Sequence, residues 1–354
     1  DMIVTIIGAR PQFIKAAIVS KALSQQNIEE MIIHTGQHYD ARMSDIFFNE
    51  LGLKYTQNLN IGSGSHAAQT AEMMIKIEEI LQQKLSETEA VLLYGDTNST
   101  LAGAIVASKL GIKIIHVEAG LRSFNKNMPE EINRIMTDHV SDFLFCSSDH
   151  SVVQLKKEGI DKNVYEVGDV MYDAMLYFGS IANEMIPDSF LNTPFFLATI
   201  HRPQNIDNKE ILGNILSAFA QSPVPLVWPL HPRAKKAITN FGLPIPENVT
   251  IREPFSYFEM LKALRLCDKV ITDSGGLQKE SYWMRKPCIT LRNETEWVET
   301  LHHQWNVTVG TEINKIVEAM KIEVPQNSWT QLYGDGTSAK KIATIISEVT
   351  SKTW

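Results

Sequence analysis

The chain has 354 residues, 44% of them hydrophobic, and a formal net charge of −8 at pH 7. This length exceeds what one hydrophobic core usually holds, so we expect a globular protein of two domains. The negative charge excludes a general electrostatic attraction to nucleic acid or to an anionic membrane, so any anionic ligand must be bound by a few placed Arg or Lys side chains.

The cysteine content favours a reducing compartment. Cys146, Cys267 and Cys288 have spacings that match neither a zinc site nor a disulfide framework. No secretory leader pattern opens the chain, and no apolar run approaches the roughly 20 residues that span a bilayer. We therefore expect a cytoplasmic protein without membrane insertion.

The first half alternates short apolar runs with amphipathic stretches of helical length, the pattern of a parallel sheet with helical crossovers. The predicted strands are 2–7, 30–35, 90–95, 112–117, 143–146 and 164–167, and the predicted helices are 11–26, 42–51, 67–85 and 97–110. A further helix begins after 168–173 and leads to a looser connector around 185–193, where we place a domain boundary.

The second half repeats this plan. Its predicted strands are 195–200, 224–230, 249–251, 269–272, 288–291 and 307–309, with helices between them. A last helix, about 337–350, follows a turn signal, and this signal leaves open which unit the helix packs on. The pattern predicts an α/β fold of two doubly wound, Rossmann-like domains that face a central cleft.

Polar groups follow several of these strands. They occur at Gly8–Pro11, Gly95–Thr97, Glu118–Arg122 and Asp273–Gly276. Ligands of open α/β sheets bind outside the carboxyl ends of the strands, so these segments predict one shared site. The stretch from His116 is the most informative, because it places a carboxylate, a glycine turn and a guanidinium at the end of an apolar strand.

A phosphate-binding element is predicted at Ser274, Gly275 and Gly276, which open a helix directly after a strand. Such a start presents free backbone N–H groups and the positive end of the helix dipole, which suits a diphosphate. Glu280 lies about one and a half turns further on, where its carboxylate can accept hydrogen bonds from both ribose hydroxyls. The alternative is a capped helix with an incidental surface glutamate.

Basic and imidazole groups at other strand ends are open to two interpretations. Arg10 and Lys15, around the start of the first helix, either face phosphate or form a solvated cationic pair. His201 and His231 each end a strand close to an arginine, so they either serve acid–base chemistry near neutral pH or are structural groups.

Three acidic residues, Asp96, Glu118 and Glu130, are candidates for proton transfer. Asp96 has a structural alternative as a helix cap, and Glu130 has one as a partner of a helix dipole, whereas Glu118 has no such alternative. Carboxylates that share a cleft raise one another's pKa, which lets one site hold both an acid and a base at neutral pH.

Nine motifs resemble the non-hydrolysing UDP-N-acetylglucosamine 2-epimerases. They keep the family's order over nearly the whole chain and are GARPQFIKAA (8–17), TGQHYD (35–40), YGDTNSTLAGA (94–104), HVEAGLRS (116–123), MPEEINR (128–134), HRPQN (201–205), HP (231–232), DSGGLQKE (273–280) and LRNETEWVE (291–299).

The resemblance implies a fold of the glycosyltransferase-B type. An N-terminal domain, 1–175, would carry the catalytic carboxylates and be joined by the C-terminal helix 337–354, and a second domain, 190–333, would bind UDP. It also implies a UDP-sugar as substrate and a homodimer, without a metal or nicotinamide cofactor and without a nucleic-acid partner.

The reaction that the resemblance implies is inversion at C2 of a UDP-linked 2-acetamido sugar, of the UDP-GlcNAc to UDP-ManNAc type. The C2 proton is not acidified by a carbonyl, so UDP is first eliminated to give a 2-acetamidoglucal and is then added back. Cleavage of the anomeric bond builds positive charge on the sugar and negative charge on UDP, which carboxylates and cations respectively stabilise.

The residues that match the family's motifs are as follows. Asp96, Glu118 and Glu130 match its catalytic carboxylates and His201 its catalytic histidine, while the predicted substrate-binding residues are Arg10, Lys15, His231, Ser274, Gly275, Gly276, Glu280 and Arg292. Glu118 and Asp96 are the preferred proton-transfer pair, and which of the two is the acid is left open.

Two departures affect the expected substrate. Gln12 and Gln204 stand where the commoner epimerases have glutamate, and this variant resembles the branch acting on UDP-2,3-diacetamido-2,3-dideoxyglucuronate. Both sugars are therefore candidates. A UDP-sugar-dependent glycosyltransferase and a non-catalytic sugar-nucleotide sensor are the less favoured alternatives, since fold does not fix function.

Overall fold

The chain forms two compact units. The computed structural model describes residues 2–37 and 41–350. Unit 1 contains the residues up to Ala174 and those from Tyr333 onward, and unit 2 contains Met175–Leu332. Helix α7 (Val170–Met185) carries the chain from unit 1 into unit 2. The last three residues of TGQHYD, 38–40, and the end of the predicted C-terminal helix, 351–354, lie outside the described residues.

Unit 1 is built on a parallel sheet of seven strands in the order β3-β2-β1-β4-β5-β6-β7. The strands are β1 (Met2–Ile7), β2 (Glu29–His34), β3 (Gln57–Asn58), β4 (Thr88–Tyr94), β5 (Lys113–Ala119), β6 (Phe143–Cys146) and β7 (Val164–Glu166). All six residues of β1 are buried, as expected for a central strand covered on both faces. The order is that of a doubly wound Rossmann sheet.

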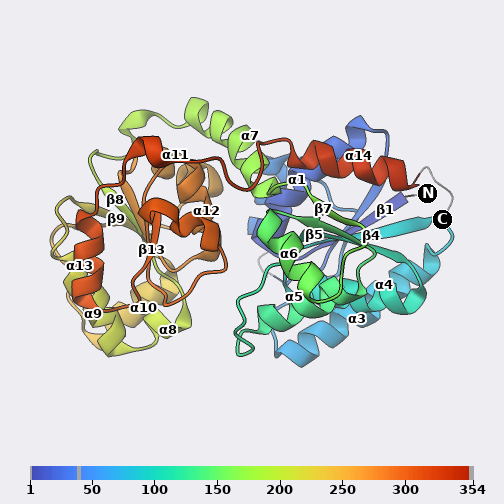
Figure 1. The fold of residues 1–354 in the computed structure, drawn as a ribbon. Coiled ribbons are helices and arrows are strands. Elements are labelled where there is room, and N and C mark those ends of the chain that lie inside the picture. The colour runs from blue at the N-terminus through green and yellow to red at the C-terminus, as the bar shows by residue number, and fades with distance from the viewer. Residues whose placement is uncertain (1, 38–40, 351–354) are drawn as a thin grey trace. The chain divides into compact units, whose positions relative to one another are not determined.

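The strands are connected by the helices α1 (Arg10–Gln25), α2 (Ala41–Leu51), α3 (His66–Gln83), α4 (Asn98–Leu110), α5 (Pro129–Val140) and α6 (Asp149–Lys157). The C-terminal helix α14 (Ser338–Thr350) also belongs to this unit. The bounds of α4 have a local cause, because the Thr97 hydroxyl caps its first turn and Gly111 ends it in the left-handed region. Helix α14 packs on α1, so the C-terminal helix belongs to unit 1 (Figure 1).

Unit 2 has a parallel sheet of six strands in the order β10-β9-β8-β11-β12-β13, which repeats the Rossmann pattern. The strands are β8 (Phe196–Thr199), β9 (Leu226–Pro229), β10 (Val249–Arg252), β11 (Lys269–Thr272), β12 (Cys288–Thr290) and β13 (Asn306–Thr308). The helices are α8 (Pro203–Ile206), α9 (Lys209–Phe219), α10 (Pro232–Phe241), α11 (Tyr257–Leu266), α12 (Gly275–Trp283) and α13 (Ile313–Lys321), with 3-10 turns at Asp188–Phe190, Val298–Gln304 and Gln326–Ser328.

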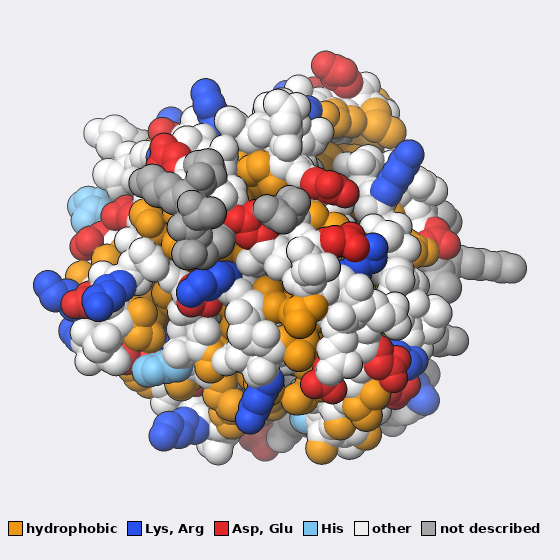
Figure 2. All heavy atoms as spheres, turned by 90° about the vertical axis from the view of Figure 1, so that its right-hand side faces the viewer, with side chains coloured by type: hydrophobic (Ala, Val, Ile, Leu, Met, Phe, Trp, Pro, Cys, Tyr) orange, Lys and Arg blue, Asp and Glu red, His pale blue; other side chains and the backbone are white. Residues whose placement is uncertain are grey.

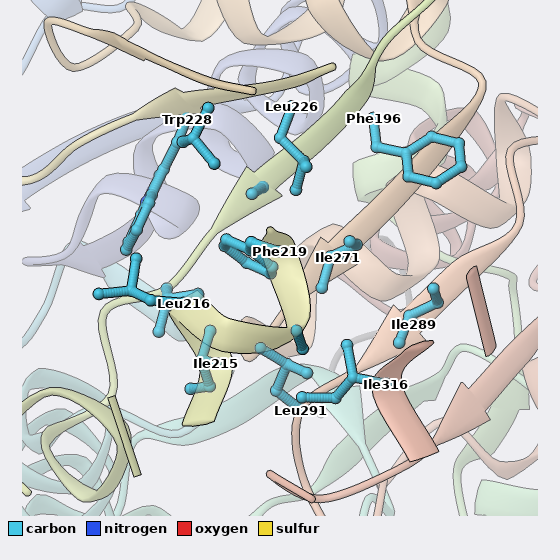
Figure 3. Close-up of a cluster of buried hydrophobic side chains, with 14 of the residues drawn as sticks. Phe196, Ile215, Leu216, Phe219, Leu226, Trp228, Ile271, Ile289, Leu291 and Ile316 are labelled. Carbon is cyan, nitrogen blue, oxygen red and sulfur yellow. The ribbon is translucent and has the colours of Figure 1, made fainter. Parts of the chain in front are cut away.

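One hydrophobic cluster of unit 2 fills the space between its sheet and the helices on one face, and a second cluster covers the other face. Figure 3 shows Trp228 and Phe219 meeting in the first of these clusters with aliphatic side chains from the neighbouring strands and helices. The two rings pack edge to face, with centroids 5.7 Å apart. This packing holds the strands rigidly, so that the loops at their carboxyl ends start from fixed positions.

The predicted class, an α/β fold of two doubly wound Rossmann-like units, is confirmed. Details of several elements differ from the prediction. β5 continues beyond the predicted end at Val117 to Ala119, and the short strand β3 had no predicted counterpart. A strand of two residues is too short for any periodic signal to reveal it.

The distribution of charged side chains on the surface agrees with the negative net charge of the sequence. Figure 2 shows one face, on which the described Lys and Arg side chains are interspersed with acidic and apolar ones. In the described part of the chain, no helix combines the length and the apolar character that crossing a membrane requires.

Candidate active site

Glu118 stands at a break in strand geometry. The pairing of β5 with β6 shifts register between Val117 and Ala119, and Glu118 has a φ of +72°. A non-glycine residue in this left-handed region costs roughly 1–2 kcal/mol, and such strain is typically found at functional sites. Gly120 follows with a φ of +80°, and a Cβ there would lie 2.5 Å from the backbone oxygen of Ser151. Only glycine fits this turn.

Lys15 reaches Glu118 from helix α1. Their side chains form an ion pair and are only 7% and 12% exposed. Burial disfavours the charged lysine, but the carboxylates of Glu118, Asp169 and Asp96 outweigh it and raise the pKa of the amine. The interpretation of Lys15 as a solvated cation is therefore wrong, because it is a buried cation whose charge is balanced by the acidic residues around it.

Asp96 follows β4, and its carboxylate accepts a hydrogen bond of 2.7 Å from Nη2 of Arg134. Burial raises the pKa of Asp96, Arg134 opposes this rise, and the nearby Glu118 adds to it. The cap of α4 is Thr97, whose hydroxyl accepts from the N–H of Thr100 at 3.3 Å. The capping alternative for Asp96 is therefore wrong, and its carboxyl is available for chemistry.

Two residues that support the acids, Arg134 and Gln12, were not predicted from the sequence to be part of the site. Arg134 is buried on α5, and its guanidinium joins Asp96 to Glu131. Gln12 is also buried, and its side chain accepts from the N–H groups of Gly8 and Ala9 and donates to the backbone oxygen of Tyr94. Gln12 thus ties the turn after β1 to the end of β4. The sequence offered one indication of their role, which is that each residue lies in a motif that matches the family.

Two of the predicted residues of unit 1 are exposed. Arg10 opens α1, and its guanidinium lies 4.5 Å from the ring centre of Phe47. Glu130 lies in the first turn of α5, where a carboxylate also complements the helix dipole. The catalytic role of Glu130 and the substrate contact of Arg10 both stay predictions.

In unit 2, the start of α12 has the predicted form of an anion cradle. Ser274 caps the helix, its hydroxyl accepting from the N–H of Leu277 at 3.4 Å, and Gly275 and Gly276 form the first turn. Glu280 bends back towards this turn, since its Oε1 lies 3.7 Å from where a Cβ on Gly276 would be. Free N–H groups and a carboxylate thus occur side by side, as a nucleotide's phosphate and ribose require.

Arg292 follows β12, and its side chain is 5% exposed. Nη2 donates to Glu296 at 3.0 Å, whereas Nε and Nη1 have no hydrogen-bond partner among the described residues. Glu296 also touches the cradle, because its Oε1 lies 2.6 Å from where a Cβ on Gly275 would be. Unsatisfied buried donors are costly, about 1–3 kcal/mol each, so this guanidinium is suited to receive an anionic ligand.

The two histidines have different surroundings. His201 is 52% exposed beside the fully buried Asp273, with its Nδ1 3.4 Å from the carboxylate. Asp273 also accepts from the N–H groups of His201 and Arg202, so it joins the end of β8 to the end of β11. His231 caps α10, its Nδ1 accepting from the N–H of Arg233 at 3.2 Å. His231 therefore has a structural function, and its substrate contact stays a prediction.

Each unit thus places functional groups of one kind at the carboxyl ends of its strands. In unit 1, Asp96 and Glu118 lie with Lys15 and Arg134, which is an arrangement for moving protons. In unit 2, the α12 start, with Glu280 and Arg292 close to it, provides an arrangement for holding an anionic nucleotide.

The sequence profile of the UDP-N-acetylglucosamine 2-epimerase family matches residues 21–347. The chain belongs to this family. The predicted activity is confirmed with it: the protein is a non-hydrolysing epimerase that acts at C2 of a UDP-linked 2-acetamido sugar.

Individual relatives agree with this assignment. The epimerase is 48% identical to a UDP-N-acetylglucosamine 2-epimerase homolog of Methanococcus maripaludis, with 97% of this chain and 99% of that protein covered. It is 45% identical to the UDP-2,3-diacetamido-2,3-dideoxy-D-glucuronate 2-epimerase of Pseudomonas aeruginosa, over 98% and 99%.

The fold agrees as well. The solved structure of the Methanocaldococcus jannaschii UDP-GlcNAc 2-epimerase, in complex with UDP-GlcNAc and UDP, is 39% identical to the epimerase and superposes with a TM-score of 0.87. The superposition covers 98% of this chain and 99% of that chain. The predicted glycosyltransferase-B type of fold is confirmed by this likeness.

Proposed function

We propose that Glu118 and Asp96 are the two proton-transfer groups of this epimerase. The observation that carries the proposal is their shared placement at the carboxyl ends of β5 and β4, in one network of charges with Lys15 and Arg134. Two protonation states are needed, because one group must take the C2 proton and the other must return a proton to the opposite face of the sugar.

The electrostatics support one assignment of the two roles. Lys15 holds Glu118 in its ionised form, which suits it to remove the C2 proton as a base. The raised pKa of Asp96 keeps that carboxyl protonated to higher pH, which suits it to donate a proton. As the C2–H bond breaks, the C1–C2 double bond forms and UDP leaves with the electrons of the C1–O bond. Proton return to C2 and addition of UDP to C1 complete the inversion.

Unit 2 supplies the nucleotide contacts in this proposal. The N–H groups at Ser274, Gly275 and Gly276 and the guanidinium of Arg292 bind the diphosphate, and Glu280 accepts from the ribose hydroxyls. Lys15 and Arg10 add cations in unit 1, while His201 and Glu130 complete the predicted catalytic set. Cations at the diphosphate stabilise UDP as negative charge develops on it.

UDP-GlcNAc is the first candidate substrate, and the solved relative of Methanocaldococcus jannaschii carries UDP-GlcNAc in its complex. UDP-2,3-diacetamido-2,3-dideoxyglucuronate is the second, favoured by the 45% identity to the Pseudomonas aeruginosa enzyme over 98% of the chain. The two sugars differ by an acetamido group and a carboxylate, so a site shaped for one should discriminate against the other.

A turnover assay with both sugar nucleotides tests this choice. We expect the purified enzyme to convert UDP-GlcNAc with a kcat/KM at least about 10-fold above that for the uronate, the range that one or two contacts supply. The reverse preference would make the uronate the substrate. Turnover of neither sugar, in protein that binds UDP, would contradict both candidates.

Replacement of Arg134 tests the role of Asp96 through pH. Arg134 lowers the Asp96 pKa, so in Arg134→Gln this pKa should rise further. Asp96 acts as the base when the reaction runs in reverse, and in that direction it must be ionised. We therefore expect the acid limb of the reverse kcat–pH profile to move to higher pH. If the acid limb stayed at the same pH in folded Arg134→Gln protein, Asp96 would not be a proton-transfer group.

The homodimer and the cytoplasmic location remain predictions. On α5, the side chains of Ile132, Met136 and Val140 are exposed at intervals of four residues and therefore form one apolar row. Such a row is typical of a protein interface and supports a homodimer, which sedimentation of the purified chain would test.

A further inference from the structure

Asp138 and His116 form a fully buried pair that the proposed chemistry does not use. Asp138 lies on α5, and its carboxylate accepts from Nδ1 of His116 at 2.6 Å and from Nη1 of Arg122 at 2.7 Å. It also accepts from the backbone N–H of Gly120 at 3.0 Å. One side chain of α5 therefore holds the glycine turn that follows Glu118.

The other nitrogen of His116 reaches the neighbouring strand end. Its Nε2 lies 2.7 Å from the backbone oxygen of Gly95, the residue immediately before Asp96. The N–H of Gly95 donates in turn to the backbone oxygen of Val117 at 3.1 Å. The ring of His116 thus links the turn before Asp96 to the turn after Glu118.

The geometry also orients this ring. A backbone carbonyl can only accept, so Nε2 carries its proton towards Gly95. Asp138 accepts from Arg122 and Gly120 through Oδ2, and its Oδ1 faces Nδ1 of His116. Both ring nitrogens of His116 are therefore held by fixed partners.

The network continues outward from Asp138. Arg122 also donates from Nε to Glu158 at 2.8 Å, and His139, on the surface of α5, reaches Glu158 at 2.9 Å. Burial raises the pKa of Glu158, but hydrogen bonds from Arg122, Gln154 and His139 outweigh it and lower that pKa to about 2. The buried cation of Arg122 thus meets two carboxylates, Asp138 and Glu158, which makes its burial tolerable.

We propose that His116 is a positioning residue for epimerisation, clamped by Asp138 so that it holds Asp96 and Glu118 at a fixed separation. The inference rests on the proposed roles of those two acids. The ring bridges both loops, because it contacts the carbonyl before Asp96 directly and the glycine turn after Glu118 through Asp138. A misplacement of reacting groups by 1 Å can cost about 10²-fold in rate, so loss of the ring should reduce catalysis without touching UDP binding.

Two variants and a matched control test the proposal. In His116→Gln and Asp138→Asn we expect kcat to fall by about 10- to 100-fold, while the Kd for UDP stays within about threefold. The control, Glu158→Gln, alters the outer end of the same network and leaves the bonds of His116 to Asp138 and Gly95 in place, so its kcat should stay within about threefold. A folded His116→Gln enzyme with unchanged kcat would overturn the proposal, as would an equal loss in the control.

A measurement on the unaltered enzyme keeps the proposal testable if the variants fail to fold. With ¹⁵N-labelled histidine, Nε2 of His116 should carry a proton that is hydrogen-bonded to the Gly95 carbonyl, and an Nε2 without a proton would overturn the clamp. Glu118→Gln, measured in the same series, distinguishes a failure of the positioning role of His116 from a failure of the proposed roles of Glu118 and Asp96. If it loses turnover while the His116 variants do not, the positioning role alone is wrong; if it keeps turnover, the proposed acids are wrong.

Discussion

Replacing Glu118 by Gln is expected to lower kcat by at least about 10²-fold, the usual contribution of a general acid or base. The amide has nearly the same shape, so it keeps the left-handed backbone turn of β5, but it cannot accept the C2 proton. UDP affinity should stay within a few-fold, because most of the predicted nucleotide contacts lie on unit 2. Steady-state rates and calorimetric UDP binding measure the two effects separately.

A matched control for this variant is Glu72→Gln. Glu72 lies on α3 in an exposed ion pair with Lys76, where such pairs contribute little, so its replacement should leave both kcat and UDP affinity unchanged. If Glu118→Gln weakened UDP binding and kept kcat at the level of this control, Glu118 would be a binding residue and the proposed base would be wrong.

Replacing Arg292 by Met should weaken UDP binding by about 10- to 100-fold, since hydrogen bonds to charged groups contribute about 1.5–3 kcal/mol. The reason is specific to this guanidinium. It is buried beside the cradle, and two of its nitrogen atoms have no partner among the described residues. Its loss would also remove one cation from the Glu296 carboxylate next to Gly275, which would then repel the diphosphate more strongly.

Calorimetric titration with UDP measures this effect, and Arg265→Met is the control. Arg265 is a half-exposed arginine of α11 that pairs with Asp188, so its replacement removes a similar charge from unit 2 away from the α12 start. Thermal unfolding without UDP shows whether the Arg292 variant is folded. An unchanged UDP Kd in a folded Arg292→Met enzyme would remove this residue from the nucleotide site.

The sequence was sufficient to predict the framework because the strands are short, apolar and buried on both faces. β11, for example, has the predicted bounds Lys269–Thr272, and the helix after it begins at the predicted Ser-Gly-Gly turn. Turn chemistry and a continuous apolar run are local properties, so they can be recognised without the fold.

The pairings within the site could not be predicted in this way. Lys15 and Glu118 are separated by 103 positions, and Asp96 and Arg134 by 38. Only the strand order of the sheet brings these residues together, and the burial that makes Lys15 a partner of Glu118 is a property of the packed unit. The left-handed backbone of Glu118 was also hidden, because it arises from the register shift against β6.

The central claim is that UDP is eliminated and added back while protons are exchanged at C2 of the sugar. The measurement that tests it most directly is incubation of the enzyme with UDP-GlcNAc in deuterated water, followed by mass and NMR analysis of the recovered sugar nucleotides. Elimination and re-addition with proton exchange should leave deuterium at C2 in the epimer and, as the reaction reverses, in the remaining substrate. An epimer that formed with its original C2 hydrogen, or transfer of the sugar to an acceptor without exchange at C2, would contradict it.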